Sequence, residues 1–592
     1  MATAAALSGK VTGGAFLIED ASARDVFTPE DLTEEHLAVA RSAREFVEKE
    51  LLPRSDEMQH GNYDVAVELM RKAAALGLEA VLTPEQYGGM EMDLASSLVV
   101  AEQLAREASF AGWHGAHAGI GTLPLLLFGT EAQKQKYLPK LSSCEWIASY
   151  CLTEAHAGSD ALAAKTRADL SEDGTHYILN GQKMWITNAG KADFFTVFAK
   201  IGGEQFSAFL VERTFNGVSV GAEEKKMGIK GSSTAPVFFD NVHVPVENLL
   251  GEAGRGHIIA FNILNVGRLK LGAFALGGSK SVLQTSLAYA QNRKAFGTSI
   301  ATFGVIRHKL AEMAIRIYAA ESMTWRVDGM IAGQMQDFAW SQADAAQRMM
   351  KAVEEFAAEC SIIKVYASEV LDYVVDEGVQ IHGGYGYHQD YAVERAYRDS
   401  RINRIFEGTN EINRLLTTGM LLKRAQQGRL GLVKAAKAVM AEILAGPQAV
   451  DDISEEQRLV KNAKKIALLL LAAAFEKYAA ELDKQQEVMS AIADVTMDVF
   501  AMESALLRCE KAGKGDGQAP SQAGDMTAVL LRDAMAHIEA SARPVLAACS
   551  EGDALRANMA VLRRFAKYEP VDSIGLRRRI CDRLLAAGRF VI

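Results

Sequence analysis

The stretch His176–Thr187, HYILNGQKMWIT, marks a change along the chain from helical to extended periodicity. Its β-branched and aromatic residues flank the dipeptide Asn180-Gly181, which is typical of a tight turn between two antiparallel strands. We therefore predict a β-hairpin here. The stretches FFTVFAKI, FSAFLV and APVFFDNVHV follow with Gly-rich or polar breaks, so we assign residues 147–257 to a compact, barrel-like β domain.

On both sides of this domain apolar residues recur every three or four positions, which is the period of an amphipathic helix. Residues 1–146 include the run HLAVARSAREFVEKELL and predict an N-terminal helical domain. Three or four long runs over residues 258–425 predict a four-helix bundle, and residues 426–592 predict an additional helical domain. The expected fold class is mainly α with a central β domain.

Composition excludes several classes of protein. The chain has 592 residues, 49% of them hydrophobic, and its net charge of −10 is spread along the sequence, which does not suit a nucleic-acid partner. Six scattered cysteines without a CxxC pair predict reduced thiols and no metal site. No signal or transit peptide is evident, and the longest apolar run, Ile466–Phe475, is about half of the ~20 residues that span a bilayer. We expect a cytoplasmic protein.

Four segments could carry chemistry, although nucleotide-binding, metal-hydrolase and serine-hydrolase motifs are absent. Small residues in these segments allow a flat or phosphorylated ligand to approach the backbone, and Arg293 could pair with a phosphate. Taken singly, the first two segments fit an ordinary turn and a core aromatic better than a binding site, and the others fit a solvated arginine or an inter-helix loop at least as well. The segments are YCLTEAHAGSD (150–160), KMWITN (183–188), NRKAFG (292–297), and QIHGGYGY (380–387) with RIFEGTNEI (404–412).

Glu407, in RIFEGTNEI, has two interpretations. It could be a helix-end acid that the dipole of a helix starting near Thr409 favours. It could also be a general base beside an apolar pocket, where desolvation would raise its pKa toward neutral pH. The local residues favour neither.

In their order and spacing over residues 30–425, these segments together resemble the acyl-CoA dehydrogenase family. The resemblance implies FAD and acyl-CoA bound between the three domains. It identifies Glu407 as the catalytic base, which takes the α-proton while the β-hydride passes to the flavin. The implied FAD contacts are Tyr150, Leu152, Thr153, Ser159, Trp185, Thr187, Arg293, Phe296, Gln380, Gly384, Thr409 and Glu411. The implied substrate contacts are Ser159, Asn265, Arg268 and Gly408.

Two positions depart from common family patterns. Ala155-His156 stand where relatives have a proline followed by Gly or Ser, which leaves the rigidity of this loop open. Some relatives carry the base on the preceding helix instead, but Val266-Gly267 offer no acid there.

The long C-terminal continuation most resembles the very-long-chain acyl-CoA dehydrogenase branch and its bacterial relatives. This implies long-chain substrates in fatty acid β-oxidation, a homodimer, and electron-transferring flavoprotein as the electron acceptor. Peripheral membrane contact through the C-terminal domain is also compatible with the resemblance, although a helical domain packed on the bundle is the simpler interpretation. Gly112 and Ala116 fall where larger side chains close the acyl tunnel in medium-chain relatives, so we expect a deep tunnel.

Two other functions stay open at this point. One is an acyl-CoA oxidase that passes electrons to oxygen. The other is a non-catalytic scaffold or assembly relative, although an intact Glu407, Arg293 and Trp185 argue against it because a scaffold needs no base.

Overall fold

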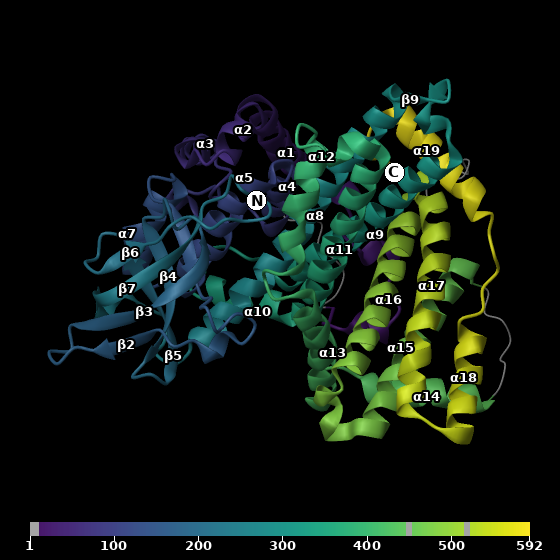
Figure 1. Ribbon diagram of the computed structural model, residues 1–592. Coiled ribbons are helices and arrows are strands. Elements are labelled where there is room, and N and C mark those ends of the chain that lie inside the picture. Colours follow the sequence, from purple (N-terminus) through teal and green to yellow (C-terminus); the bar gives the residue numbers. More distant parts are fainter. Residues whose placement is uncertain (1–10, 446–452, 514–520) are drawn as a thin grey trace.

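Helices make up most of the chain, and one eight-stranded sheet lies at one side of them (Figure 1). The computed structural model describes residues 11–445, 453–513 and 521–592. Residues 1–10, where no targeting signal is expected, lie outside the described residues. The predicted fold class, mainly α with a central β domain, is confirmed.

The N-terminal helical region is built from short, capped helices. Thr33 accepts the His36 N–H at the start of α1, and Thr130 and Gln133 cap α7 reciprocally, so orphan N–H groups are satisfied at both starts. A π-helical segment, Gly115–Gly121, follows α5. The helices are α1 (Glu34–Phe46), α2 (Ser55–Gln59), α3 (Tyr63–Ala75), α4 (Leu94–Leu104), α5 (Ala108–His114), α6 (Leu123–Phe128) and α7 (Glu131–Ser142).

The central sheet has the strand order β6-β7-β3-β2-β4-β5-β8, and β1 pairs with β4 in parallel. Phe194, Phe195, Phe198 and Phe209 on β4 and β5 are fully buried and supply much of its core. The strands are β1 (Ala148–Cys151), β2 (Arg167–Leu170), β3 (His176–Thr187), β4 (Phe194–Ile201), β5 (Gln205–Glu212), β6 (Val218–Val220), β7 (Thr234–Pro245) and β8 (Leu249–Leu250).

The hairpin predicted at Asn180-Gly181 is wrong. β3 runs unbroken from His176 to Thr187, and the register of its pairing with β7 shifts between Leu179 and Gly181. Gly181 has φ of 151°, and a Cβ there would lie 2.6 Å from Thr166 Oγ1. Two residues of β7, Asp240 and Asn241, stand opposite Asn180 alone, so the dipeptide faces a β-bulge of β7 and its glycine supplies backbone freedom at this irregularity.

The bundle follows the sheet, and its first helix is its most apolar. Within the described part of the chain, α8 is the one helix long and apolar enough to cross a membrane, but 67% of its most apolar window is buried. It packs against α11, α9 and α4, as the central helix of a bundle does. The elements are α8 (Gly256–Asn292), β9 (Lys294–Ala295), β10 (Thr298–Ser299), α9 (Gly304–Gln334), α10 (Ala345–Glu355), α11 (Ala357–His382), α12 (Ala392–Ser400) and α13 (Asn410–Gln426).

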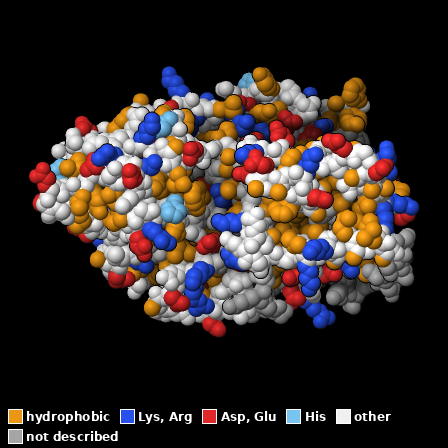
Figure 2. Space-filling model, turned by 90° about the horizontal axis from the view of Figure 1, so that it is seen from below, with side chains coloured by type: hydrophobic (Ala, Val, Ile, Leu, Met, Phe, Trp, Pro, Cys, Tyr) orange, Lys and Arg blue, Asp and Glu red, His pale blue; other side chains and the backbone are white. Residues whose placement is uncertain are grey.

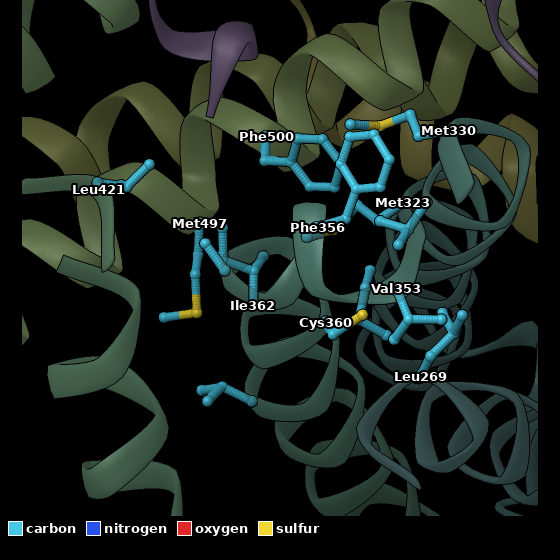
Figure 3. Packing of buried hydrophobic residues seen from close by; sticks show 14 of the residues in the cluster. Leu269, Met323, Met330, Val353, Phe356, Cys360, Ile362, Leu421, Met497 and Phe500 are labelled. Carbon is cyan, nitrogen blue, oxygen red and sulfur yellow. The ribbon is translucent and has the colours of Figure 1, made fainter. Parts of the chain in front are cut away.

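The C-terminal extension shares one hydrophobic core with the bundle. Phe500 of the extension lies beside Phe356 and Met323 of the bundle, and Met497 lies near Ile362 (Figure 3). The extension is therefore packed onto the bundle. Its helices are α14 (Leu432–Ala445), α15 (Glu455–Tyr478), α16 (Gln486–Ala512), α17 (Gln522–Cys549), α18 (Gly552–Phe565) and α19 (Ser573–Ala587).

The segment before α1 also packs on the extension, which the sequence did not indicate. The Phe16 and Phe500 rings lie 4.8 Å apart, and Lys464 Nζ donates to the Glu19 carbonyl at 2.6 Å. Arg508 binds Glu30. Residues 11–33 thus form an N-terminal strap that joins the start of the described chain to the C-terminal extension.

Candidate active site

Glu407 lies in the short loop between the 3-10 turn Arg401–Arg404 and α13, in a left-handed conformation with φ of 58°. Its Oε2 is buried and has no hydrogen-bond partner in the described part of the chain, although the residue is partly accessible. Gly267 of α8 lies directly against the carboxylate, because a Cβ there would be 2.8 Å from Oε2. Thr409, and not Glu407, caps α13 by accepting the Ile412 N–H.

Three side chains from three helices bind the carbonyl groups of this loop. Arg268 Nε of α8 donates to the Glu407 carbonyl at 3.2 Å. Lys364 Nζ of α11 donates to the Gly408 carbonyl at 2.7 Å, and Asn413 Nδ2 of α13 to the same oxygen at 2.8 Å. A non-glycine residue keeps a left-handed conformation only when its surroundings hold it, and such strain concentrates at functional sites.

The environment of Glu407 suits a general base. Burial raises the pKa of Glu407 to about 7, while the charges of Arg268 and Lys364 act to lower it. The Tyr150 hydroxyl of β1 is buried without a partner in the described residues, and burial together with the Glu407 charge raises its pKa well above the usual range. A carboxyl that ionises near neutral pH therefore lies among a phenol and two cations.

The predicted substrate contacts fall in two places. Asn265 and Arg268 are buried and bonded to each other at 2.8 Å, which orients Arg268 toward the Glu407 loop. A Cβ at Gly112 would meet Ser232 Oγ at 3.2 Å, so Gly112 borders the sheet region. Ala116 is buried in the π-helical segment. The tunnel role of Gly112 and Ala116 stays a prediction.

The predicted flavin contacts near the sheet fit a flat ligand. Trp185 is 55% exposed on β3 with φ of 56°, so a large aromatic face is held at the surface beside a second irregularity in the strand. Tyr150 and Leu152 are buried beneath this region, and Thr153 and Thr187 are partly exposed. Ser159 is exposed in the glycine-containing loop, Thr409 is partly exposed, and Glu411 is exposed at the start of α13.

The loop with the Ala155-His156 departure is held by Glu154. Its carboxylate accepts the Lys165 N–H at 2.7 Å and binds buried Lys183 Nζ, also at 2.7 Å. His156 Nε2 lies 3.5 Å from the other side of the same carboxylate. The Glu154 carboxylate therefore joins His156 of this loop to Lys165 and Lys183.

The other predicted flavin contacts form a separate cluster. Arg293 follows the end of α8 and stacks on the Tyr385 ring at 5.4 Å, and Phe296 at the tip of the β9–β10 hairpin is 97% exposed. Gln380 and Gly384 are exposed nearby at the end of α11. Gly267 and Arg293 are 26 positions apart on or next to α8, or roughly 39 Å at helical rise. Arg293 therefore lies far from Glu407 of the same chain.

Sequence reasoning missed Lys364, Asn413 and the contact of Gly267 with the carboxylate. Lys364 interrupts an otherwise apolar helical face in IIKVYASEV, and this was the one signal available. A charge on a buried face needs a specific partner.

An N-terminal helical region, a β domain and a bundle that holds a buried glutamate between α8 and α13 define an acyl-CoA dehydrogenase. Family models match the chain as the N-terminal, middle and C-terminal domains of acyl-CoA dehydrogenase over residues 33–145, 149–242 and 254–421. A further acyl-CoA dehydrogenase C-terminal domain matches residues 462–564. The chain belongs to the acyl-CoA dehydrogenase family, whose members depend on FAD.

Three individual members of the family show which enzymes this chain resembles. The chain is 47% identical to a probable acyl-CoA dehydrogenase of Bacillus subtilis over 98% of both chains. It is 36% identical to the human mitochondrial very long-chain specific acyl-CoA dehydrogenase, over 75% of this chain and 69% of the relative. A crystal structure of acyl-CoA dehydrogenase complexed with FAD from Bacillus anthracis is 46% identical, with a TM-score of 0.96, over 98% of this chain and 100% of that one.

We expect kcat/KM for a saturated acyl-CoA to rise with pH through about 7. Only the ionised carboxylate can accept a proton, and burial moves the pKa of Glu407 upward from its usual 4.5. Activity is therefore lost as the pH falls through neutrality. Initial rates with a dye acceptor at constant ionic strength measure this limb, and a limb near the ordinary glutamate pKa would contradict the assignment.

Proposed function

We propose that this acyl-CoA dehydrogenase converts long-chain acyl-CoA to trans-2-enoyl-CoA in fatty acid β-oxidation. The observation that carries the proposal is the Glu407 carboxylate, which lies against Gly267. Its Oε2 is buried without a hydrogen-bond partner in the described residues, so this oxygen is free to accept a proton. Glu407 takes the α-proton of the thioester. FAD, held by residues such as Thr153, Trp185 and Thr187, would supply the acceptor for the hydride from the β-carbon.

The loop that carries the base also suits thioester binding. The Glu407 N–H makes no hydrogen bond within the described part of the chain, so it is free to donate to the thioester carbonyl. A donor at that oxygen stabilises the charge that develops as the α-proton leaves. Gly408, with φ of 81°, brings no side chain between the carbonyl and this N–H.

A preference for long chains is supported by the very long-chain specific relative, by the extension, and by the small residues Gly112 and Ala116. The test is anaerobic bleaching of the purified yellow protein with butyryl-, octanoyl-, palmitoyl- and arachidoyl-CoA. We expect the fastest bleaching with the two longest. Bleaching by none would overturn the dehydrogenase proposal, whereas a maximum at butyryl-CoA would overturn only the long-chain preference.

A homodimer accounts for the separate cluster around Arg293. Phe296 is nearly fully exposed and lies far from Glu407 in the same chain, so a second copy offers the natural route for this cluster to meet FAD. Light scattering of the holoenzyme should give twice the chain mass of 64.1 kDa. A monomer mass would contradict this arrangement.

We further propose that the enzyme is cytoplasmic, passes electrons to electron-transferring flavoprotein, and contacts a membrane surface through α14. This helix exposes Val433, Met440 and Leu444 beside Lys434 and Lys437, and apolar side chains gather among charges on the lower face (Figure 2). An apolar stripe flanked by lysines suits an anionic interface. Flotation with anionic vesicles tests the contact, and reduction of the flavoprotein rather than release of peroxide tests the acceptor.

Two arginines of the basic run at residues 577–579 of α19 are bound in ion pairs and contribute little to such a surface. Arg577 is buried and paired with Glu312 and Asp533, and Arg579 pairs with buried Asp525. These charges hold α19 against α9 and α17.

A further inference from the structure

We propose that Lys364 is a positioning residue for proton abstraction: by binding the Gly408 carbonyl it keeps Glu407 in its strained conformation, and its charge favours the ionised base. The proposal rests on Glu407 as the base. It gives α11 a role in proton abstraction, a step to which no predicted site residue of this helix contributes.

The first observation is the free-energy cost of burying the Lys364 ammonium group. The side chain is fully buried, yet the two groups it binds are neutral: the Gly408 carbonyl and Asn410 Oδ1, each at 2.7 Å. By contrast, buried Lys183 and Lys464 each bind a carboxylate. A buried cation without a directly bonded anion is expensive, so the site requires its charge or its donors for another purpose.

The second observation is what its hydrogen bonds hold. Glu407 and Gly408 are consecutive left-handed residues, with φ of 58° and 81°. Lys364 and Asn413 bind the Gly408 carbonyl, and Arg268 binds the Glu407 carbonyl. Without Lys364 the Gly408 carbonyl keeps only the Asn413 bond, and the loop is free to relax toward ordinary backbone angles. Such a change would move the Glu407 carboxylate away from Gly267.

The third observation is electrostatic. Arg268 of α8, Lys364 of α11 and the Tyr150 phenol of β1 are the titratable groups around Glu407. Burial lowers the pKa of Lys364 to about 7 against the opposing charge of Glu407, and Arg268, Glu411 and Glu369 act on it as well. Lys364 acts to lower the pKa of Glu407, so removing its charge would raise the pH at which the base ionises.

The test compares two variants of the holoenzyme. Lys364→Met keeps the length and apolar stem of the side chain but removes its charge and donors. We expect FAD absorbance and near-ultraviolet circular dichroism to be retained and kcat to fall ~100-fold, as a misplaced catalytic group predicts. The acid limb of the pH–kcat profile should shift to higher pH. Lys364→Arg keeps the charge, so it should leave the acid limb in place while its bulkier head lowers kcat.

The control is Lys464→Met, which removes a buried lysine of the extension that lies outside the Glu407 loop and binds Glu503. It should lower thermal stability without moving the acid limb. The proposal is overturned if Lys364→Met keeps its rate, or loses rate with the limb unmoved. If Lys364→Met fails to retain FAD, the test rests on Lys364→Arg. An acid limb that shifts in Lys364→Arg overturns the proposal, whereas an unshifted limb with a lowered kcat supports it. Failure of Glu407 as the base is detected separately by Glu407→Gln.

Discussion

Glu407→Gln should lower kcat roughly a thousandfold, a loss of ~4 kcal/mol of barrier lowering, while FAD and acyl-CoA still bind. Glutamine has nearly the same volume and shape as glutamate, so the contact with Gly267 and the loop conformation are kept. Its amide oxygen, however, cannot accept a proton from carbon. The raised pKa of the wild-type carboxyl indicates that the site is arranged for this transfer.

Rapid mixing of the anaerobic variant with palmitoyl-CoA measures this loss as the rate of flavin bleaching, and titration of the flavin spectrum measures binding. Glu476→Gln is the matched control, since Glu476 is an exposed acid on α15 of the extension, outside the predicted site. It should bleach within a few-fold of the wild-type rate. Near-normal turnover of Glu407→Gln would place the base on another residue.

Arg508→Ala should destabilise the protein by ~3 kcal/mol, because it removes one of the two cations that bind the buried Glu321 carboxylate. Arg508 of α16 is 2% exposed and binds Glu321 of α9 at 2.7 Å and Glu30 of the N-terminal strap at 2.6 Å. Glu321 also pairs with Lys280 of α8. Burial acts to raise the pKa of Glu321, and the two cations together bring it well below its usual range. Arg508 thus joins the N-terminal strap, the bundle and the extension.

Calorimetry of the holoenzyme measures this effect as a lowered transition temperature. Arg556→Ala is the matched control, because Arg556 and its partner Asp553 are both largely exposed on α18 and exposed pairs contribute little. We expect no measurable change from it. An Arg508→Ala variant with an unchanged transition would mean that the other contacts, among them the packed core of Phe356 and Phe500, are sufficient to join the extension to the bundle.

Periodicity was sufficient to predict the order of helical, β and helical regions, because burial against one face imposes a repeat of 3.6 on a helix and of two on a strand. It failed at Asn180-Gly181. A turn and a bulge both use glycine at unusual backbone angles, and the choice depends on whether a neighbouring strand continues the pairing. β7 pairs with β3 on both sides of Gly181, so the strand continues.

The residues of RIFEGTNEI indicated Glu407 as the base only after distant segments were compared with a known family. The chain alone specified helix periods, caps and the apolar faces that α8 and α11 bury, since these depend on neighbours within a few positions. The conformation and basicity of Glu407 depend on Arg268 and Lys364, which bond to its loop across 139 and 44 positions of sequence. Contacts between such distant segments do not appear as a periodic pattern in the sequence. The burial of Glu407 and the electric field at its carboxylate are set by how whole helices pack around its loop.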